Sequence, residues 1–391
     1  MIRLAILGST GSIGESALEV VRRHPDRFRV TALSANRRVS ELAAQVEEFR
    51  PAAAVVANGG GEALAASTGT TRWQEGRDAL VALAAREDVD VVVNALVGAA
   101  GLEPTLTALE EGKRLALANK ESLVAGGALV MAAARRGGGE IIPVDSEHSA
   151  ILQCLRGASP REVARLILTA SGGPFRGWNL NRLRDVRPEQ ALKHPTWDMG
   201  SKITIDSATL ANKALEVIEG HFLFGVGYDR IDAVVHPQSI VHSFVEFVDG
   251  SVLAQVGPPN MELPILYALT YPERIEDTTL RNYDPVASSP LTFEAVDHHA
   301  FPLFGLGVGA GARGGMAPAV FNAANEVAVE AFLQGRIGFL AMADVVARAL
   351  DGASPADPGS LAEVLEADRE ARRVAGIEAD RLHREGRGGH G

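Results

Sequence analysis

The sequence predicts an α/β protein, and three observations carry this prediction. A short apolar run, Ile2–Leu7, ends in the glycine turn Gly8–Gly14 and is followed by a helical pattern. Apolar strand candidates then alternate with helix candidates up to about residue 150, and amphipathic helical patterns dominate the C-terminal part. Because strands alternating with helices form a parallel sheet covered on both faces, we expect a Rossmann-like N-terminal domain. An α+β catalytic and connecting domain and a C-terminal α-helical bundle should follow it.

The length of 391 residues is too great for one ordinary core and suggests two or three domains. The expected division has a nucleotide-binding domain, a catalytic, metal-binding and dimerisation domain, a linker, a helical domain and a disordered tail. Their bounds are residues 1–145, 146–285, 286–302, 303–383 and 384–391, respectively.

Charge and cysteine content exclude several classes of function. The formal net charge is −11, which argues against nucleic-acid binding, because that binding depends on Lys and Arg neutralising phosphates. Cys154 is the only cysteine, so a thiolate metal cluster is excluded and a reducing compartment is favoured. No signal peptide or apolar run of about 18 residues is recognisable. We therefore expect a cytoplasmic protein without a membrane partner.

The glycine turn has the spacing G-x-x-G-x-x-G, formed by Gly8, Gly11 and Gly14. Glycines at such a strand–turn–helix junction let a pyrophosphate approach the amide groups of the helix N-terminus. A plain tight turn is the alternative, and the strand–helix context favours the dinucleotide interpretation.

The segment after the second strand candidate, Phe28–Leu33, indicates which dinucleotide binds. A fold that selects NAD places an acidic residue there, whereas this sequence has Asn36, Arg37 and Arg38. Guanidinium groups suit a 2′-phosphate, so we predict NADP. A solvated basic turn is the alternative.

The alternation continues with strand candidates Ala53–Ala57, Val89–Ala95 and Leu115–Ala118 and with a helix candidate Glu75–Ala85. Loops at the carboxyl ends of parallel strands face the ligand, so Gly98–Gly101 and the residues after Ala118 should lie near the nicotinamide end.

Two acidic groups of residues suggest a metal site. Asp145 and Glu147 follow the strand candidate Ile141–Val144, and in an extended segment their side chains would point to the same side. A single helix is expected over Ile205–Glu219, with one face that presents Asn212, Lys213, Glu216 and Glu219. Carboxylate oxygens without thiolates suit Mg²⁺ or Mn²⁺. From spacing alone, solvated surface pairs are the favoured alternative for the Lys–Glu pairs.

The segments Ser171–Phe175 and His194–Gly200 carry glycine, proline, an isolated Trp197 and Met199. Such a segment is typical of a mobile lid over a small ligand, with a long surface loop as the alternative. Farther on, Pro318–Leu333, Leu340–Ala349 and Leu361–Ala375 read as helices, and Gly335 fits the end of the first.

Seven short sequence motifs, taken together in their order along the chain, resemble those of a known enzyme family. The sequence resembles the 1-deoxy-D-xylulose 5-phosphate reductoisomerases from Met1 to about Leu350. The motifs are Leu7–Gly14, Ala118–Ser122, Val144–His148, Ala170–Phe175, Asp206–Glu219, His236–Ser239 and Phe321–Glu326.

The resemblance implies a homodimer that converts 1-deoxy-D-xylulose 5-phosphate to 2-C-methyl-D-erythritol 4-phosphate in non-mevalonate isoprenoid biosynthesis. NADPH and one divalent cation, Mg²⁺, Mn²⁺ or Co²⁺, would be its cofactors. Asp145, Glu147 and Glu216 would hold the metal and, with Lys120, act in catalysis.

The resemblance also implies the binding residues. Those that would bind substrate are Glu121, Ser146, Ser171, His194, Trp197, Ser207, Asn212 and Lys213, of which Ser171, Ser207, Asn212 and Lys213 would hold the phosphate. Those that would bind the cofactor are Gly8, Thr10, Gly11, Ser12, Ile13, Gly14, Asn36, Arg37, Arg38, Ala95, Asn119, Met199, Gly200 and Met261.

Two segments depart from the family pattern. Asn260-Met261-Glu262 stands where Asp-Met-Arg is more usual, which puts contacts near Met261 in doubt. Phe304–Gly315 is unusually rich in glycine, and we expect it to loosen the C-terminal bundle.

Two other functions compete with this interpretation. A semialdehyde-type dehydrogenase shares such a glycine turn but needs a nucleophilic cysteine, and Cys154 lies in an apolar helical setting that suits a buried structural thiol. A non-catalytic NADPH-sensing module would not need the acidic residues Asp145, Glu147 and Glu216.

Replacing both Arg37 and Arg38 with Ala should raise the KM for NADPH far more than the KM for NADH, because only NADPH carries the 2′-phosphate. Steady-state kinetics with the two cofactors measures this. Equal effects on both would remove the 2′-phosphate role.

Overall fold

A parallel sheet of seven strands forms the centre of the N-terminal part in the computed structural model, which describes residues 1–60, 69–197 and 199–388. The sheet order is β4-β3-β2-β1-β5-β6-β7, and each neighbouring pair is parallel. Every residue of β3 and β5 is buried, as expected for strands covered on both faces. The strands are β1 Ile2–Leu7, β2 Phe28–Ala35, β3 Ala53–Val56, β4 Arg72–Glu75, β5 Val91–Asn94, β6 Arg114–Leu117 and β7 Glu140–Pro143.

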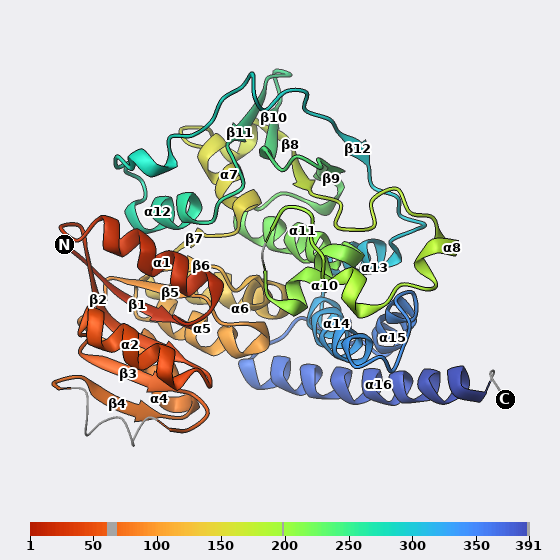
Figure 1. Ribbon diagram of the computed structural model, residues 1–391, viewed down its shortest axis with the longest axis horizontal. Coiled ribbons are helices and arrows are strands. Elements are labelled where there is room, and N and C mark those ends of the chain that lie inside the picture. Colours follow the sequence, from red (N-terminus) through yellow and green to blue (C-terminus); the bar gives the residue numbers. More distant parts are fainter. Residues whose placement is uncertain (61–68, 198, 389–391) are drawn as a thin grey trace. The chain divides into compact units, whose positions relative to one another are not determined.

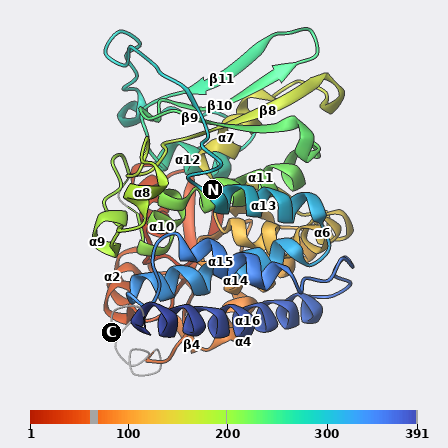
Figure 2. The same ribbon diagram turned by 90° about the vertical axis from the view of Figure 1, so that its right-hand side faces the viewer.

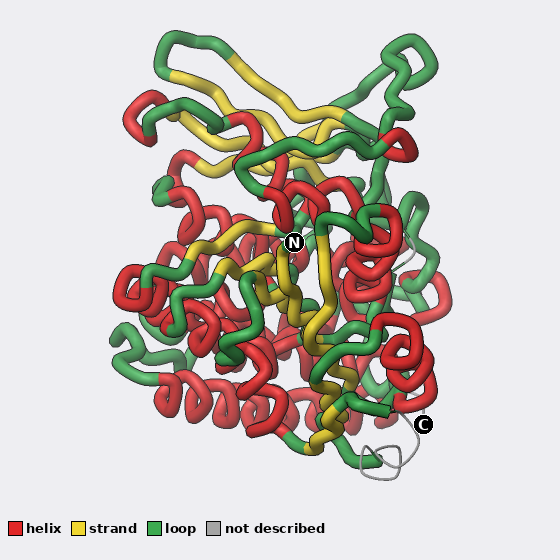
Figure 3. The backbone as a smooth tube through the Cα atoms, turned by 90° about the vertical axis from the view of Figure 1, so that its left-hand side faces the viewer, coloured by secondary structure: helices red, strands yellow, loops and turns green. Residues whose placement is uncertain are grey.

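Helices cover this sheet on both faces (Figures 1 and 3). α1 packs against α12, and α4 packs against α5. The predicted Rossmann-like arrangement is confirmed, although Glu75 belongs to β4 rather than to the helix expected over Glu75–Ala85. The helices are α1 Ser12–Arg23, α2 Val39–Phe49, α4 Arg77–Ala84, α5 Leu102–Glu110, α6 Lys120–Gly137 and α12 Glu262–Thr270, with a short 3₁₀ helix at Gly98–Gly101.

The chain forms two compact units, whose bounds differ from the expected domains. The first unit comprises residues 1–122, 129–149 and 260–281, and the second comprises 123–128, 150–259 and 282–391. Residues 260–281 belong to the first unit, where α12 packs against α1, β6 and β7, and Arg23 of α1 makes ion pairs with Glu262 (2.6 Å) and Asp277 (2.8 Å). The two residues of each ion pair are more than 200 positions apart in the sequence, so a local sequence pattern could not predict the contact.

The second unit contains a mixed sheet in the order β11-β10-β8-β9-β12. β8 and β9 are parallel and the other neighbours are antiparallel. Residues 286–302, expected as a linker, include β12, which adds to this sheet. The strands are β8 Val163–Ala170, β9 Ile231–Val235, β10 Val241–Phe247, β11 Val252–Val256 and β12 Glu294–Ala295.

Helices α10 and α11 follow one another where a single helix is expected over Ile205–Glu219. Leu210 has φ +58°, in the left-handed region, and separates the two helices. Leu210 is buried, so tertiary packing overrides the helical preference of leucine. The bounds here are α7 Ser146–Cys154, α8 Leu180–Leu183, α9 Pro188–Ala191, α10 Ser201–Thr209 and α11 Ala211–Phe224, with 3₁₀ turns at Pro160–Glu162, Tyr228–Arg230 and, in the first unit, Thr278–Leu280.

Four helices complete the second unit and stack beside α11 (Figure 2). α13 packs on α11, and α14 packs on α13, α15 and α16. The glycine-rich segment 304–315, expected to loosen this part, lies in and just after α13, where buried Gly307 and Gly311 allow close helix packing. The helices are α13 Pro302–Arg313, α14 Ala317–Leu333, α15 Ala341–Leu350 and α16 Leu361–Gly388.

The C-terminal tail, expected to be disordered from Arg384, continues α16 as far as Gly388. Arg381 pairs with Glu378 (2.6 Å) and Glu385 (2.5 Å) at helical spacing, which supports the extra turns. Residues 389–391 lie outside the described residues. Among the described helices, none is both long and apolar enough to cross a membrane.

Replacing Gly305 and Gly309 of α13 with Ala should stabilise the protein by roughly 0.5–1 kcal/mol each, since Ala reduces the backbone entropy that folding removes. Both glycines are exposed, and a Cβ at either would have no heavy atom of the described chain within 4 Å, apart from its own neighbours and helix backbone. Urea unfolding of the double variant measures the gain. An unchanged or lower midpoint would contradict it.

Candidate active site

The glycine turn joins β1 to α1 in a conformation that requires glycine. Gly8 has φ +84°, and a Cβ at Gly14 would lie 2.4 Å from the carbonyl oxygen of Gly8. Gly11, which has no side chain, occupies the N-cap of α1 and is exposed, as is Ser12. The predicted strand–turn–helix is therefore confirmed, and the N-terminal amide groups of α1 form a cradle suited to a phosphate group.

Two buried polar residues, Ser9 and Gln45, fix the shape of this turn, and neither was among the predicted site residues. Ser9 donates its hydroxyl to Oε1 of Gln45 (2.6 Å), and Gln45 donates back to the carbonyl of Ser9 (3.0 Å). The amides of Gly8 and Ser9 donate to the carbonyl of Ser34 at the end of β2. The turn is thus tied to β2 and α2.

The basic segment after β2 lies at the same edge of the sheet. The Arg38 guanidinium donates to the carbonyl of Thr10 (2.8 Å), and Asn36 bonds to Asn58. Asn36, Arg37 and Arg38 are all exposed. The structure therefore places Arg38 at the glycine turn, where a 2′-phosphate would meet a positive charge.

Asn119 shapes the loop beyond β5. Its side-chain nitrogen donates to the carbonyls of Leu96 (2.9 Å) and Gly98 (3.0 Å), and its Oδ1 accepts from the Ser122 amide (3.1 Å), capping α6. The carbonyl oxygen of Ala95 lies 2.8 Å from where a Cβ on Gly8 would be. The ends of β1, β5 and β6 thus meet at one edge, as predicted.

Lys120 and Asp145 form a buried ion pair in the first unit, with 2.6 Å between Nζ and Oδ2 and side chains only 8% and 10% exposed. Glu147 does not lie on an extended segment as expected: β7 ends at Pro143, and Glu147 is in the first turn of α7. Asp145 precedes that helix, and its Oδ1 accepts from the Glu147 amide (3.2 Å). Negative charge is favourable at a helix N-terminus, which explains the change of geometry.

Buried Glu121 accepts a hydrogen bond from Asn119 (3.1 Å), and Ser146 donates to Glu147. These polar groups follow the ends of β6 and β7, neighbouring parallel strands of the first unit.

α11 presents the predicted polar face in the second unit. Glu216 accepts hydrogen bonds from Asn212 and from Lys213. Lys213 and Glu216 are 3% and 1% exposed, so the alternative of a solvated surface pair is wrong. Burying such a pair costs free energy unless each charge is compensated. Buried charged groups of this kind are typical of a functional site.

Ser171, His194 and Ser207 converge at another point of the second unit. Nε2 of His194 lies 2.9 Å from Oγ of Ser171 and 3.1 Å from Oγ of Ser207. Gly173, with φ +62°, permits this approach, because a Cβ there would lie 2.9 Å from the Ser207 carbonyl oxygen. Two hydroxyl groups and an imidazole N–H can jointly bind an oxyanion such as phosphate.

His194 is held as a neutral imidazole. Its Nδ1 accepts backbone hydrogen bonds from Thr196 (3.1 Å) and Trp197 (2.9 Å), so the proton is on Nε2. Burial lowers the pKa of His194 below its ordinary value. Trp197 and Met199 are half-buried and Gly200 is exposed, close to His194 in the sequence. The histidine thereby anchors the start of the predicted lid.

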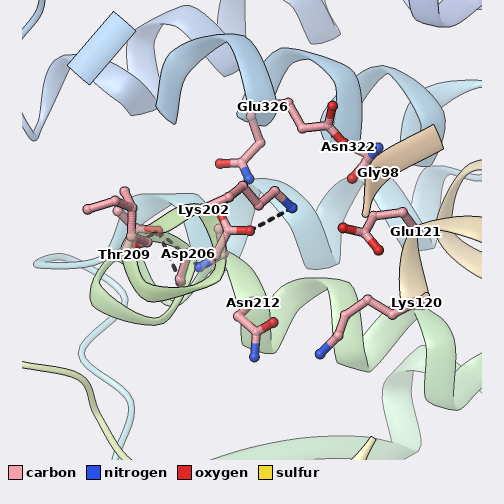
Figure 4. Close-up of polar contacts among 12 residues, drawn as sticks. Gly98, Lys120, Glu121, Lys202, Asp206, Thr209, Asn212, Asn322 and Glu326 are labelled. Atoms are coloured by element: carbon pink, nitrogen blue, oxygen red, sulfur yellow. Dashed lines mark hydrogen bonds and ion pairs between the residues drawn. The ribbon is translucent and has the colours of Figure 1, made fainter. Parts of the chain in front are cut away.

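Asp206, the neighbour of Ser207 on α10, is held by two partners. It pairs with Lys202 (2.8 Å), as the dashed line in Figure 4 shows, and accepts from Asn325 of α14 (2.8 Å). Asp206 and Asn325 are both buried. Neither was selected as a site residue, although both lie in runs that carry the family resemblance.

The remaining predicted residue, Met261, directly precedes α12 in the first unit. The departure around it is accommodated, because Oδ1 of Asn260 accepts from the Glu262 amide (2.6 Å) and Glu262 pairs with Arg23 (2.6 Å). The predicted metal ligands divide between the units, with Asp145 and Glu147 in the first and Glu216 in the second.

The backbone amides around His194 should lose protection from hydrogen exchange as the pH falls. The folded state disfavours the proton that the unfolded chain binds near pH 6.5, so the stabilisation present above that pH is lost below it. We expect the amides of Thr196 and Trp197 to exchange faster at pH 5.5 than at pH 7.5, after correction for intrinsic rates. Hydrogen exchange measures this, with β8 as an internal control. Equal protection at both pH values would contradict it.

Comparison with known proteins identifies the same family along nearly the whole chain. Three family models match it, described as 1-deoxy-D-xylulose 5-phosphate reductoisomerase (residues 4–127), the C-terminal domain of that enzyme (141–224) and DXP reductoisomerase C-terminal domain (256–374). The reductoisomerase of Ralstonia nicotianae is 52% identical over 96% of this chain and 97% of its own length. That of Rhodococcus jostii is 54% identical over 95% and 93%.

Solved structures give the same result. The Zymomonas mobilis reductoisomerase in complex with NADPH is 44% identical with a TM-score of 0.90, covering 97% of this chain and 99% of its own. A DOX-P reductoisomerase in complex with NADPH, fosmidomycin and magnesium is 40% identical with a TM-score of 0.93, covering 97% and 98%. This chain belongs to the 1-deoxy-D-xylulose 5-phosphate reductoisomerase family.

Proposed function

We propose that this chain converts 1-deoxy-D-xylulose 5-phosphate to 2-C-methyl-D-erythritol 4-phosphate in non-mevalonate isoprenoid biosynthesis. It is an NADPH- and divalent-metal-dependent enzyme. The observation that carries this function is the 40% identity over 97% of the chain to a reductoisomerase that holds NADPH, fosmidomycin and magnesium. The buried acidic, basic and hydroxyl groups described above supply the chemistry that these ligands need.

The donor set fits a hard divalent cation. Asp145 and Glu147 of the first unit and Glu216 of the second would hold it, and they offer only carboxylate oxygens. Such ligands suit Mg²⁺ and Mn²⁺, and Co²⁺ is a further candidate. When bound, the cation polarises the substrate's oxygen atoms and stabilises the negative charge that the rearrangement develops.

The phosphate group of the substrate would be held in the second unit. Ser171, Ser207 and His194 already converge on one point, with 2.9 and 3.1 Å between His194 and the hydroxyls. Asn212 would add a directed hydrogen bond and Lys213 a positive charge. Binding energy from this remote group helps to orient the reacting carbons.

Residues of the first unit would act nearer the reacting carbons. Lys120 places an ammonium group beside Asp145, where it can stabilise developing negative charge on a substrate oxygen. Ser146 and Glu121 would contact the substrate hydroxyl groups through hydrogen bonds. Trp197 would exclude water, so that the aldehyde formed by rearrangement is reduced rather than hydrated.

NADPH would bind the first unit and supplies the hydride for that reduction. The glycine turn Gly8–Gly14 presents amide groups to the pyrophosphate, and Arg37 and Arg38 meet the 2′-phosphate. Ala95 and Asn119 lie at the same sheet edge, and Met261 would line the nicotinamide site.

The homodimer is supported by the free edge of the second sheet. β11 is the terminal strand in the order of the described strands, and exposed Val252, Leu253 and Val256 lie along it. An edge strand with apolar side chains on its surface tends to pair with another chain. We propose that a second copy of this chain covers it.

A cytoplasmic location is proposed from the cysteine content. Cys154 is the only cysteine of the sequence, which suits a reducing compartment.

The semialdehyde-type dehydrogenase is not favoured. Cys154 is half-buried at the end of α7 and packs against the apolar core of the second unit, which suits a structural thiol. A nucleophilic cysteine needs an activating base and an accessible position.

The function is tested by following NADPH absorbance with 1-deoxy-D-xylulose 5-phosphate and Mg²⁺ or Mn²⁺, then with excess EDTA. We expect oxidation that depends on both the substrate and the metal. Bound NADPH without any turnover would overturn the activity and leave only the dinucleotide site.

The substitution Glu216→Gln should weaken binding of the divalent cation, because it removes one of the three negative charges proposed as ligands. We expect the Mg²⁺ concentration that gives half-maximal activity to rise at least about tenfold. Glu330→Gln, an exposed change on α14, is the matched control and should leave it unchanged. Full activity of Glu216→Gln at low Mg²⁺ would contradict the ligand role.

A further inference from the structure

We propose that Gly307 and Gly311 of α13 are positioning residues for the divalent-cation site. They set how closely α13 supports α11, the helix that carries Glu216. This inference rests on the proposed function, because it takes Glu216 as a ligand of the cation. It concerns contacts within the second unit, to which both helices belong.

α11 has two opposite faces with different tasks. At about 100° per residue, the polar residues of α11 lie within roughly 60° of Glu216 around the helix axis. Ala214 and Ile218, two residues before and after Glu216, lie about 160° from it on the opposite face. The polar residues are Asn212, Lys213 and Glu219.

α13 contacts that opposite face through its two buried glycines. A Cβ at Gly307 would lie 2.6 Å from Cβ of Ala214, and a Cβ at Gly311 would lie 2.8 Å from Cγ1 of Ile218. Carbon atoms pack at about 3.5–4.0 Å, so any side chain at either position forces a shift on the order of 1 Å.

Residues behind α13 limit the directions in which it could retreat. A Cβ at Gly307 would also meet the ring of Phe321 of α14 at 2.6 Å, and a Cβ at Gly311 would meet the ring of Tyr228 at 2.7 Å. Phe321 is fully buried. α11 would therefore have to move with its carboxylate face, or distort.

The other two glycines of α13 show that packing, rather than the helix itself, requires Gly307 and Gly311. Gly305 and Gly309 are exposed, and the described chain offers no contact to a Cβ at either. All four positions share the same helix, so Gly309→Ala is a control that adds the same methyl group on the open side.

A shift of this size matters for a metal ligand. Coordination distances are held within about 0.2 Å, and changes in groups that orient ligands typically cost 10–100-fold in metal affinity. We therefore expect Gly307→Ala to weaken the cation site even though it touches no ligand.

The test is direct Mn²⁺ binding to the full chain, measured from the electron paramagnetic resonance signal of free Mn²⁺. We expect Gly307→Ala to weaken Mn²⁺ binding about tenfold or more, and Gly309→Ala to match the unchanged protein. NADPH binding, measured by fluorescence titration, should be the same in all three, because its site lies in the other unit. If Gly307→Ala does not fold, Gly311→Ala takes its place.

Val364→Ala separates positioning from general destabilisation. Val364 is buried on α16, and its truncation should lower the melting temperature while leaving the Mn²⁺ affinity unchanged. Wild-type affinity in Gly307→Ala, or an equal loss in Val364→Ala or Gly309→Ala, would overturn the inference. Absence of Mn²⁺ binding in the unchanged protein would overturn the proposed metal dependence, and this inference with it.

Discussion

The burial of carboxylate groups is the constraint on which the rest of this site depends. Asp145 lies 2.6 Å from Lys120 in the first unit, and Glu216 pairs with Lys213 in the second. Removing a carboxylate from water costs several kcal/mol unless partners compensate it. Each of these two carboxylates is therefore compensated by a lysine of its own unit. Such compensation restrains each carboxylate within its own unit, which would reduce the reorganisation that ligand binding requires.

Glycine provides the second requirement, close approach of the backbone to atoms of neighbouring elements. At Gly14 it lets α1 begin directly above the β1 turn, and at Gly173 it brings the end of β8 against the Ser207 carbonyl. At Gly307 and Gly311 it brings α13 against α11. These contacts support, in that order, the glycine turn proposed to bind the cofactor, the hydroxyl groups proposed to bind phosphate, and helix α11. The glycine-rich composition thus serves packing as well as turns.

The sequence predicted six of the seven strands of the parallel sheet, because each of these six contains a short apolar run. It missed β4, Arg72–Glu75, which is mostly polar. It failed where distant contacts decide the local structure. Leucine favours helices, so nothing local indicates that Leu210 breaks one. The return of residues 260–281 to the first unit involves packing of α12 on α1 and ion pairs with Arg23, both between residues distant in the sequence. Most of the candidate site was selected through the family resemblance; Gln45 and Asn325, which support it through hydrogen bonds, carry no chemical signature in the sequence.

The central proposal is that Asp145, Glu147 and Glu216 hold one divalent cation, and a crystal structure grown with Mn²⁺, NADPH and a phosphonate substrate analogue tests it most directly. Anomalous scattering would locate the ion. We expect one strong peak with oxygens of Asp145, Glu147 and Glu216 at about 2.0–2.3 Å, the range typical of hard cations with carboxylates. A peak held by the residues of one unit alone, or by side chains other than these three, would contradict the account.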